Sequence, residues 1–151
     1  MEKRKIFIGA DSAGFEMKNA LCEHLREAGY DVTDCGCFSG ASCHYPEFAE
    51  VGCKSVQEAP DAHFGILVCG TGIGMSMAAN RVPGIRAAVC TNEFHASYSR
   101  AHNNANIICP LGKFQMRILC QIFSGHRVPD YICGNHFLII LRVLFHIAGK
   151  K

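Results

Sequence analysis

The sequence of 151 residues lacks several features that would assign a protein to a class at once. Its formal net charge is only +2 and charges of both signs are interspersed, which excludes the electrostatic footprint of a protein that binds nucleic acid or an anionic membrane. The apolar run at residues 137–148 is about 12 residues long, whereas a membrane span needs about 20. The charged start leads directly into a strand pattern without the apolar segment of a signal peptide.

Cysteine, in contrast, is abundant, with ten residues in the chain. The cysteines are scattered through predicted strands and helices and are not spaced as in a small secreted disulfide framework. We therefore expect reduced thiols in a cytoplasmic protein. A metal site could be drawn from Cys35, Cys37, Cys43, His44 and Cys53, but their spacing matches no common zinc pattern.

Apolar strand patterns alternate with helical patterns along the chain. Strands are predicted at residues 6–10, 30–35, 64–69, 85–90 and 106–109, and helices at 15–28, 46–57, 75–80 and 92–102. Strands separated by helices imply right-handed crossovers and a parallel sheet covered on both faces. No repeat, linker or low-complexity segment divides the chain, so we expect a single domain over residues 1–151.

The most informative segment is residues 69–74, Cys-Gly-Thr-Gly-Ile-Gly, which follows an apolar strand and opens a helix. Free N–H groups and the dipole at a helix start favour an anion, and the same field favours the thiolate of Cys69 as a base or nucleophile. A dinucleotide fingerprint fits poorly because the third glycine comes too early, and the Gly-Lys-Ser/Thr ending of a nucleotide-triphosphate loop is absent. The structural alternative is a tight turn with a buried, inert cysteine.

Other polar residues are expected beside this loop, because loops converge at the carboxyl ends of parallel strands. They follow or precede the predicted strands and helices: Asp11, Ser12, Tyr45, His102 and Asn103. Asp11 could equally cap the helix that begins near Gly14, and a histidine at a helix end is more often a capping or packing residue. Together with Cys69 these residues predict a base, a proton shuttle and an anion cradle.

Five motifs in order resemble a known family. They are residues 8–15 (Ile-Gly-Ala-Asp-Ser-Ala-Gly-Phe), 45–49 (Tyr-Pro-Glu-Phe-Ala), 69–80, 83–88 (Pro-Gly-Ile-Arg-Ala-Ala) and 99–106 (Ser-Arg-Ala-His-Asn-Asn-Ala-Asn). Over residues 4–109 the chain resembles the type B ribose-5-phosphate isomerases, within the RpiB and LacAB group of sugar-phosphate isomerases. The resemblance implies a Rossmann-like three-layer α/β/α sandwich with a five-stranded parallel sheet. It also implies a homodimer with sites shared between subunits, no metal or other cofactor, and interconversion of ribose 5-phosphate and ribulose 5-phosphate.

The resemblance also implies a role for each site residue in an aldose–ketose exchange through an enediolate. Cys69 is the base that moves a proton between C2 and C1, and Thr71 assists this transfer. The anion hole is formed by the backbone amides of the glycine loop: Gly70, Gly72, Ile73 and Gly74. His102 opens the furanose ring with Asp11 nearby. Asn103 and Tyr45 hold sugar hydroxyls.

The chain departs from the family pattern in two places. Members that use ribose phosphate usually carry a phosphate-binding His where this chain has Ser12, which brings no charge. Residues 110–151 diverge, and Lys113, Arg117, Arg127 or Arg142 would have to replace the family's phosphate-binding arginines. Two alternatives therefore stay open: an isomerase of another sugar phosphate, and a catalytically weak or inactive homologue that keeps the fold and dimer. The abrupt change also suggests a reading-frame change or alternative splice in the coding sequence.

Overall fold

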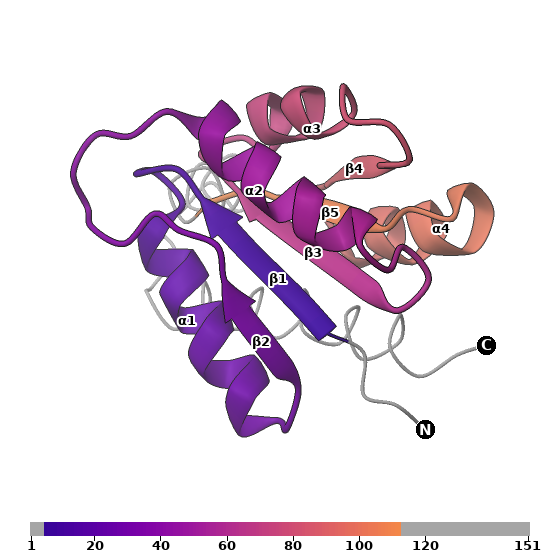
Figure 1. Cartoon of the computed structure of the whole chain (residues 1–151), viewed down its shortest axis with the longest axis horizontal. Coiled ribbons are helices and arrows are strands. Elements are labelled where there is room, and N and C mark those ends of the chain that lie inside the picture. The colour runs from indigo at the N-terminus through magenta and orange to yellow at the C-terminus, as the bar shows by residue number, and fades with distance from the viewer. Residues whose placement is uncertain (1–4, 113–151) are drawn as a thin grey trace, which may run out of the picture.

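The computed structural model describes residues 5–112, in which strands and helices alternate (Figure 1). In chain order the elements are β1 (Lys5–Ala10), α1 (Phe15–Glu27), β2 (Asp31–Asp34), α2 (Tyr45–Gln57), β3 (His63–Val68), α3 (Ile73–Ala79), β4 (Ala87–Cys90), α4 (Glu93–Asn103) and β5 (Ile107–Pro110). Every strand and helix predicted from the sequence in this range is confirmed, with bounds that differ by no more than about two residues.

The five described strands form one sheet in the order β2-β1-β3-β5-β4, and every pairing is parallel. The longest register joins β1 to β3, from Lys5 opposite His63 to Ala10 opposite Val68. β2 lies on one side of β1 and β3 lies on the other, so the order in which strands are added to the sheet reverses between β1 and β3. In such sheets a ligand crevice lies at the carboxyl ends of the strands on either side of this switch point.

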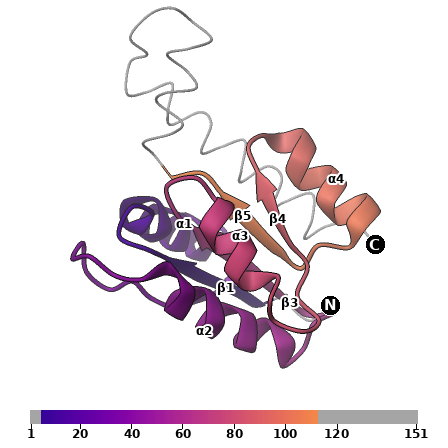
Figure 2. The same ribbon diagram turned by 90° about the horizontal axis from the view of Figure 1, so that it is seen from above.

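Helices cover both faces of the sheet, which confirms the three layers (Figure 2). The strands alternate their side chains between the two faces, so Ile6 and Ile8 contribute to one core and Phe7 to the other. α1 and α4 close the first core through Leu21, Leu25 and other apolar residues. α2 and α3 close the second core, which includes Cys69 at the end of β3.

One buried position in α1 was not expected from its pattern. Lys18 is 1% exposed, and its ammonium pairs with the carboxylate of Asp34 at the end of β2. Its Nζ also lies 5.6 Å from the ring centroid of Phe15 and 5.7 Å from that of Phe38. The other oxygen of Asp34 accepts the Gly36 amide at 2.9 Å, so the buried ion pair anchors the turn that follows β2.

No helix among residues 5–112 has both the length and the apolar character needed to cross a bilayer. The expectations for the apolar run at residues 137–148 and for the four candidate replacement cations lie outside the described residues. The same holds for the interpretation of the C-terminal segment beyond residue 112.

Candidate active site

Cys69 directly follows β3, and both its side chain and its backbone carbonyl accept hydrogen bonds from backbone amides. Its Sγ accepts a hydrogen bond from the Gly72 amide at 3.1 Å, and its carbonyl oxygen accepts one from the Gly112 amide at 2.8 Å. Gly72 has φ +73°, and a Cβ built there would lie 2.4 Å from the Cys109 carbonyl oxygen. Only glycine fits this left-handed, crowded position, so the turn back onto the sulfur depends on it. Cys69 itself is 5% exposed.

The glycine loop also binds its own threonine. The exposed hydroxyl of Thr71 accepts the Ile73 amide at 3.2 Å. Two amides that were predicted for the anion hole, those of Gly72 and Ile73, therefore donate to Cys69 and Thr71 in this structure. These hydrogen bonds orient the thiol and the hydroxyl.

The turn after β1 packs against the loop after β3. The Asp11 amide donates to the Val68 carbonyl at 3.2 Å, and Asp11 Oδ1 accepts the Gly14 amide at 2.9 Å. A Cβ on Gly14 would lie 2.5 Å from the Val68 oxygen, and one on Gly70 would lie 3.7 Å from Ala13 Cβ. The structure thus places Asp11 next to the cysteine loop. Its side chain also stabilises the turn before α1, but the N-cap of this helix is Gly14 and carries no side-chain cap, so Asp11 is not the cap of α1.

Tyr45 reaches the same loop from α2. A Cβ on Gly74 would lie 3.2 to 3.5 Å from three atoms of the Tyr45 ring, so the ring packs on this glycine. Tyr45 is 41% exposed and Ser12 is exposed, which leaves both side chains accessible to a ligand. Asp11, Ser12, Tyr45 and the loop at residues 69–74 therefore gather at one edge of the sheet.

His102 and Asn103 do not join this group within one chain, so the expectation that they lie at the carboxyl ends of the strands beside Cys69 is not met within a single subunit. They end α4 and precede β5, so they lie at the amino edge of the parallel sheet. The neighbouring Arg100 guanidinium lies 5.0 Å from the ring centroid of Phe64, near the start of β3. Phe64 and Cys69 are opposite ends of an extended stretch, about 16 Å apart at about 3.3 Å per residue.

His102 completes an exposed row of rings on α4, here called the aromatic ladder: Phe94, Tyr98 and His102. The ring centroids of Phe94 and Tyr98 are 4.1 Å apart, and those of Tyr98 and His102 are 4.8 Å apart with an interplanar angle of 2°. Phe94 is 61% exposed and Tyr98 is 48% exposed. These large apolar surfaces at i, i+4 spacing form one continuous face beside His102.

The cysteines of the described range are free thiols, and most of them are buried. Burial raises the pKa of Cys35 and of Cys90 to about 11 and that of Cys53 to about 12, so these thiols stay neutral. Residues 5–112 contain no group of three or more side chains that could hold a metal ion. The sequence did not reveal that the sulfurs of Cys37 and Cys43 lie 3.0 Å apart.

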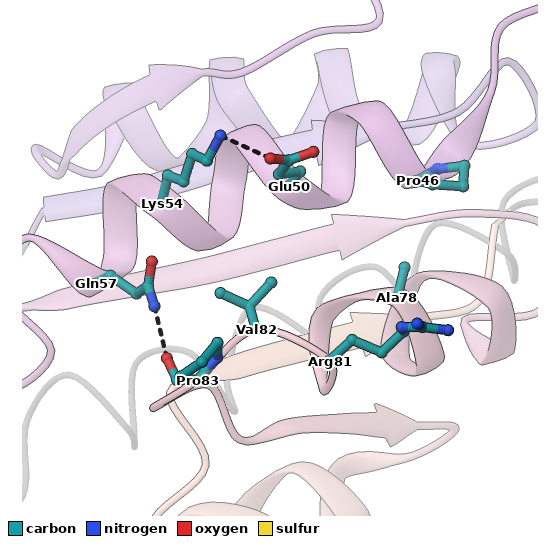
Figure 3. Close-up of a pocket in the computed structure, with 8 residues that line it drawn as sticks. All are labelled: Pro46, Glu50, Lys54, Gln57, Ala78, Arg81, Val82 and Pro83. Atoms are coloured by element: carbon teal, nitrogen blue, oxygen red, sulfur yellow. Dashed lines mark hydrogen bonds and ion pairs between the residues drawn. The ribbon is translucent and has the colours of Figure 1, made fainter.

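A pocket of about 360 Å³ lies between α2 on one side and the end of α3 with the segment that follows it on the other (Figure 3). Its lining is of mixed polarity and comprises Pro46, Glu50, Lys54, Gln57, Ala78, Arg81, Val82 and Pro83. Lys54 is paired with Glu50, and the Gln57 amide donates to the Pro83 carbonyl at 2.6 Å. None of the site residues predicted from the sequence lines this pocket.

Sequence reasoning missed one residue that shapes the site. The Gly112 amide binds the Cys69 carbonyl, and a Cβ at Gly112 would lie 3.1 Å from that oxygen and 3.2 Å from the Ala13 oxygen. The sequence held part of the signal, because residues that follow any strand of a parallel sheet lie at its carboxyl edge, but the pairing of β5 with β3 came only from the structure.

The fold and the thiol at its switch point define an α/β enzyme of the Rossmann-like type. Residues 6–122 match the family model described as Ribose/Galactose Isomerase, and the chain belongs to this family. The match extends beyond residue 109, where the resemblance found by motif ended.

Relatives with solved structures or curated descriptions agree with this membership. The chain is 41% identical over 105 residues to ribose-5-phosphate isomerase B of Escherichia coli, covering 70% of each chain. A ribose 5-phosphate isomerase structure from Thermotoga maritima is 46% identical, with a TM-score of 0.69 over 72% of this chain and 74% of that one. The Mycoplasma genitalium ribose-5-phosphate isomerase B with bound ribulose-5-phosphate is 31% identical, with a TM-score of 0.70 over 97% of both chains.

Proposed function

We propose that the protein interconverts ribose 5-phosphate and ribulose 5-phosphate through an enediolate, with Cys69 as the base. The observation that carries this proposal is the position of Cys69 Sγ, 3.1 Å from the Gly72 amide in a glycine loop at the switch point of the sheet. Membership in the ribose/galactose isomerase family and the substrates named for the relatives support the substrate class.

The chemistry requires one base that acts twice. The thiolate of Cys69 takes the proton from C2 of the open aldose and returns it to C1 of the enediolate, which gives the ketose. The Gly72 amide, which donates to Cys69 Sγ at 3.1 Å, holds the sulfur in a fixed position for both transfers. The Thr71 hydroxyl, oriented by the Ile73 amide, assists the proton transfer.

Charge that develops on the enediolate oxygens needs fixed donors nearby. The amides of Gly70 and Gly74 have this role, because those of Gly72 and Ile73 are engaged with Cys69 Sγ and the Thr71 hydroxyl. Tyr45, whose ring packs on Gly74, is placed to hold a sugar hydroxyl, and Asp11 lies across the switch point. A backbone donor of this kind is typically worth about 10² to 10³ in rate.

The remaining two site residues come from a second copy of the chain in this proposal. His102 opens the furanose ring and Asn103 holds a sugar hydroxyl, yet both lie at the edge of the sheet remote from Cys69. A homodimer resolves this separation, because His102 of one subunit then faces Cys69 of the other. Phe94 and Tyr98, the two exposed rings of the aromatic ladder that precede His102, provide apolar surface for such contact.

The phosphate site is the main reason to weigh a second substrate. Ser12 is exposed and neutral, and it replaces a residue that carries charge in family members that use ribose phosphate. The family description names galactose as well as ribose. The specific alternative is therefore an isomerase of another sugar phosphate, and loss of phosphate binding would give a catalytically weak homologue.

Steady-state kinetics with ribose 5-phosphate and with a hexose 6-phosphate test the proposed function. We expect isomerisation of ribose 5-phosphate, and a loss of about 10² to 10⁴ in kcat for Cys69→Ala because the base is removed. Cys90→Ala is the matched control, since it removes a buried thiol from the opposite face of the sheet. Equal activity of Cys69→Ala and the wild type would contradict the role of Cys69, and turnover of the hexose phosphate alone would establish the alternative.

A further inference from the structure

Two thiols lie against each other in the loop that joins β2 to α2. The Cys43 thiol donates a hydrogen bond to Cys37 Sγ at 3.0 Å, and the Cys37 thiol donates to the Ser39 carbonyl at 2.7 Å. A disulfide joins its sulfurs at about 2.05 Å, so the two atoms need to approach by only about 1 Å. Both residues belong to one loop, which makes this adjustment a local movement.

The two cysteines differ in accessibility and in anchorage. Cys37 is 2% exposed, and its amide donates to the Ala10 carbonyl at the end of β1. Cys43 is partly exposed and lies two residues before Tyr45. Cys37 is thus a fixed, protected thiol, and Cys43 is the one that a reagent in solution meets first.

The pair adjoins the candidate active site. Partial burial and the neighbouring Cys37 thiol, with a smaller contribution from the Asp11 carboxylate, raise the pKa of Cys43 to about 11, while the Ser12 backbone acts in the opposite direction. Cys43 therefore lies within electrostatic reach of Asp11 and Ser12, at the turn after β1. A change at its sulfur acts on the segment that leads to Tyr45.

The neighbouring thiol of Cys35 does not compete for this partner. Its side chain is directed to the Thr33 carbonyl at 3.9 Å and belongs to the core under α2. Cys35 therefore offers a matched control, two residues before Cys37 on the same stretch of chain.

We propose that Cys37 and Cys43 form a reversible disulfide, with a small disulfide such as glutathione disulfide as the oxidant. The small fraction of Cys43 that has lost its proton attacks, as the thiolate, one sulfur of glutathione disulfide, so that a mixed disulfide forms and one glutathione leaves as its thiolate. The Cys37 sulfur then attacks the Cys43 sulfur, the internal bond forms and the second glutathione leaves. Two protein thiols lose two electrons and two protons, and one glutathione disulfide becomes two thiols.

Peptide mapping of the oxidised full-length protein tests this proposal without reference to activity. The protein is incubated with glutathione disulfide, alkylated under denaturing conditions so that buried thiols also react, and cleaved by chymotrypsin, which cuts after Phe38 and separates the two cysteines. We expect two joined peptides, lighter by two hydrogen atoms than their sum, in the wild type and in Cys35→Ala. Cys43→Ser should lose the joined species.

Two results would overturn the proposal. One is recovery of Cys37 and Cys43 as separately alkylated peptides after oxidation, which would show that the thiols do not react together. The other is a glutathione adduct on Cys43 that persists, which would show that Cys37 does not attack it. The Cys35→Ala control distinguishes a link through Cys37 from one through its neighbour on the same peptide.

The disulfide also regulates the sugar-phosphate site, a consequence that rests on the proposed function. A displacement of about 1 Å near the start of α2 shifts Tyr45, and misplacement of this size costs up to about 10² in rate. We expect kcat/KM to fall about tenfold on oxidation and to recover with dithiothreitol, with no such change in Cys43→Ser. Joined peptides with unchanged kinetics would overturn the regulation, whereas an inactive reduced protein would count against the isomerase alone.

Discussion

Gly72 is the residue on which the geometry of the cysteine loop depends most. Its left-handed backbone lets the amide turn back to Cys69 Sγ, and the Cys109 carbonyl lies where a side chain would begin. Backbone strain and a steric clash therefore act at the same position. The effect of strain can be separated from that of the clash by comparison with Gly84, which has φ +78° and no atom within 4 Å of its potential Cβ.

We expect Gly72→Ala to lower the free energy of unfolding by about 3 kcal/mol or more, because a clash with backbone adds to the strain of a left-handed alanine. Gly84→Ala should lose only about 1 kcal/mol, since it adds strain alone. Urea denaturation of the two variants measures both values. Equal losses would show that the Cys109 carbonyl does not restrict this position.

Single residues were predictable where a backbone rule applied to them. The glycines of residues 69–74 follow a strand and open a helix, so the sharp turn and the position of Cys69 were expected from the sequence. The contact between Cys37 and Cys43 could not be expected, because their loop has no periodicity from which a direction could be derived.

The short strand β2 and the turn after it depend on one ion pair with α1. Lys18 is almost fully buried, while Asp34 keeps 23% of its side chain exposed and also binds the Gly36 amide. Loss of the carboxylate therefore leaves a buried ammonium without its charge partner. Loss of the ammonium leaves a carboxylate that water still reaches.

This asymmetry gives an order of stabilities. Asp34→Ala should lower the free energy of unfolding by about 3 kcal/mol, the usual cost of an unpaired buried charge. Lys18→Met should cost about 1 kcal/mol, because methionine fills the same space between the rings of Phe15 and Phe38. Chemical denaturation of both variants checks the order, and a larger loss for Lys18→Met would contradict it.

The elements themselves were largely predictable, because apolar periodicity is a local signal. Leu21 and Leu25 recur at helical spacing in α1, and both are fully buried. The burial of Lys18 was not predictable, because a pattern of apolar residues treats lysine as exposed and its partner lies 16 positions away. His102 does not meet Cys69 within one subunit because residues before a parallel strand lie at the edge opposite to those that follow one.

Across the fold, several buried thiols make stability sensitive to high pH. Burial raises the pKa of Cys90 from an ordinary value of 9.0 to about 11, so the unfolded chain releases this proton at lower pH than the folded one. The stabilisation is complete below about pH 9 and is lost as the pH rises through about 11. Cys35 and Cys53 act in the same direction.

We therefore expect the free energy of unfolding to fall between about pH 9 and pH 11, by about 1 to 3 kcal/mol for each such thiol. Urea denaturation across this range measures the slope, and Cys90→Ala should make it shallower because one titrating group is absent. A free energy of unfolding that rises between pH 9 and pH 11 would contradict this expectation. So would a pH dependence that is the same in Cys90→Ala as in the wild type.

In the proposed homodimer, each active site joins Cys69 of one subunit to His102 of the other. A direct test is subunit complementation, in which Cys69→Ala and His102→Ala chains with different affinity tags are co-expressed and the mixed dimer is purified through both tags. Each parent should be nearly inactive. The mixed dimer carries one doubly altered site and one intact site, so it should recover about half of the wild-type activity per dimer. A mixed dimer as inactive as its parents, beside an active wild type purified in the same way, would show that the site is not shared.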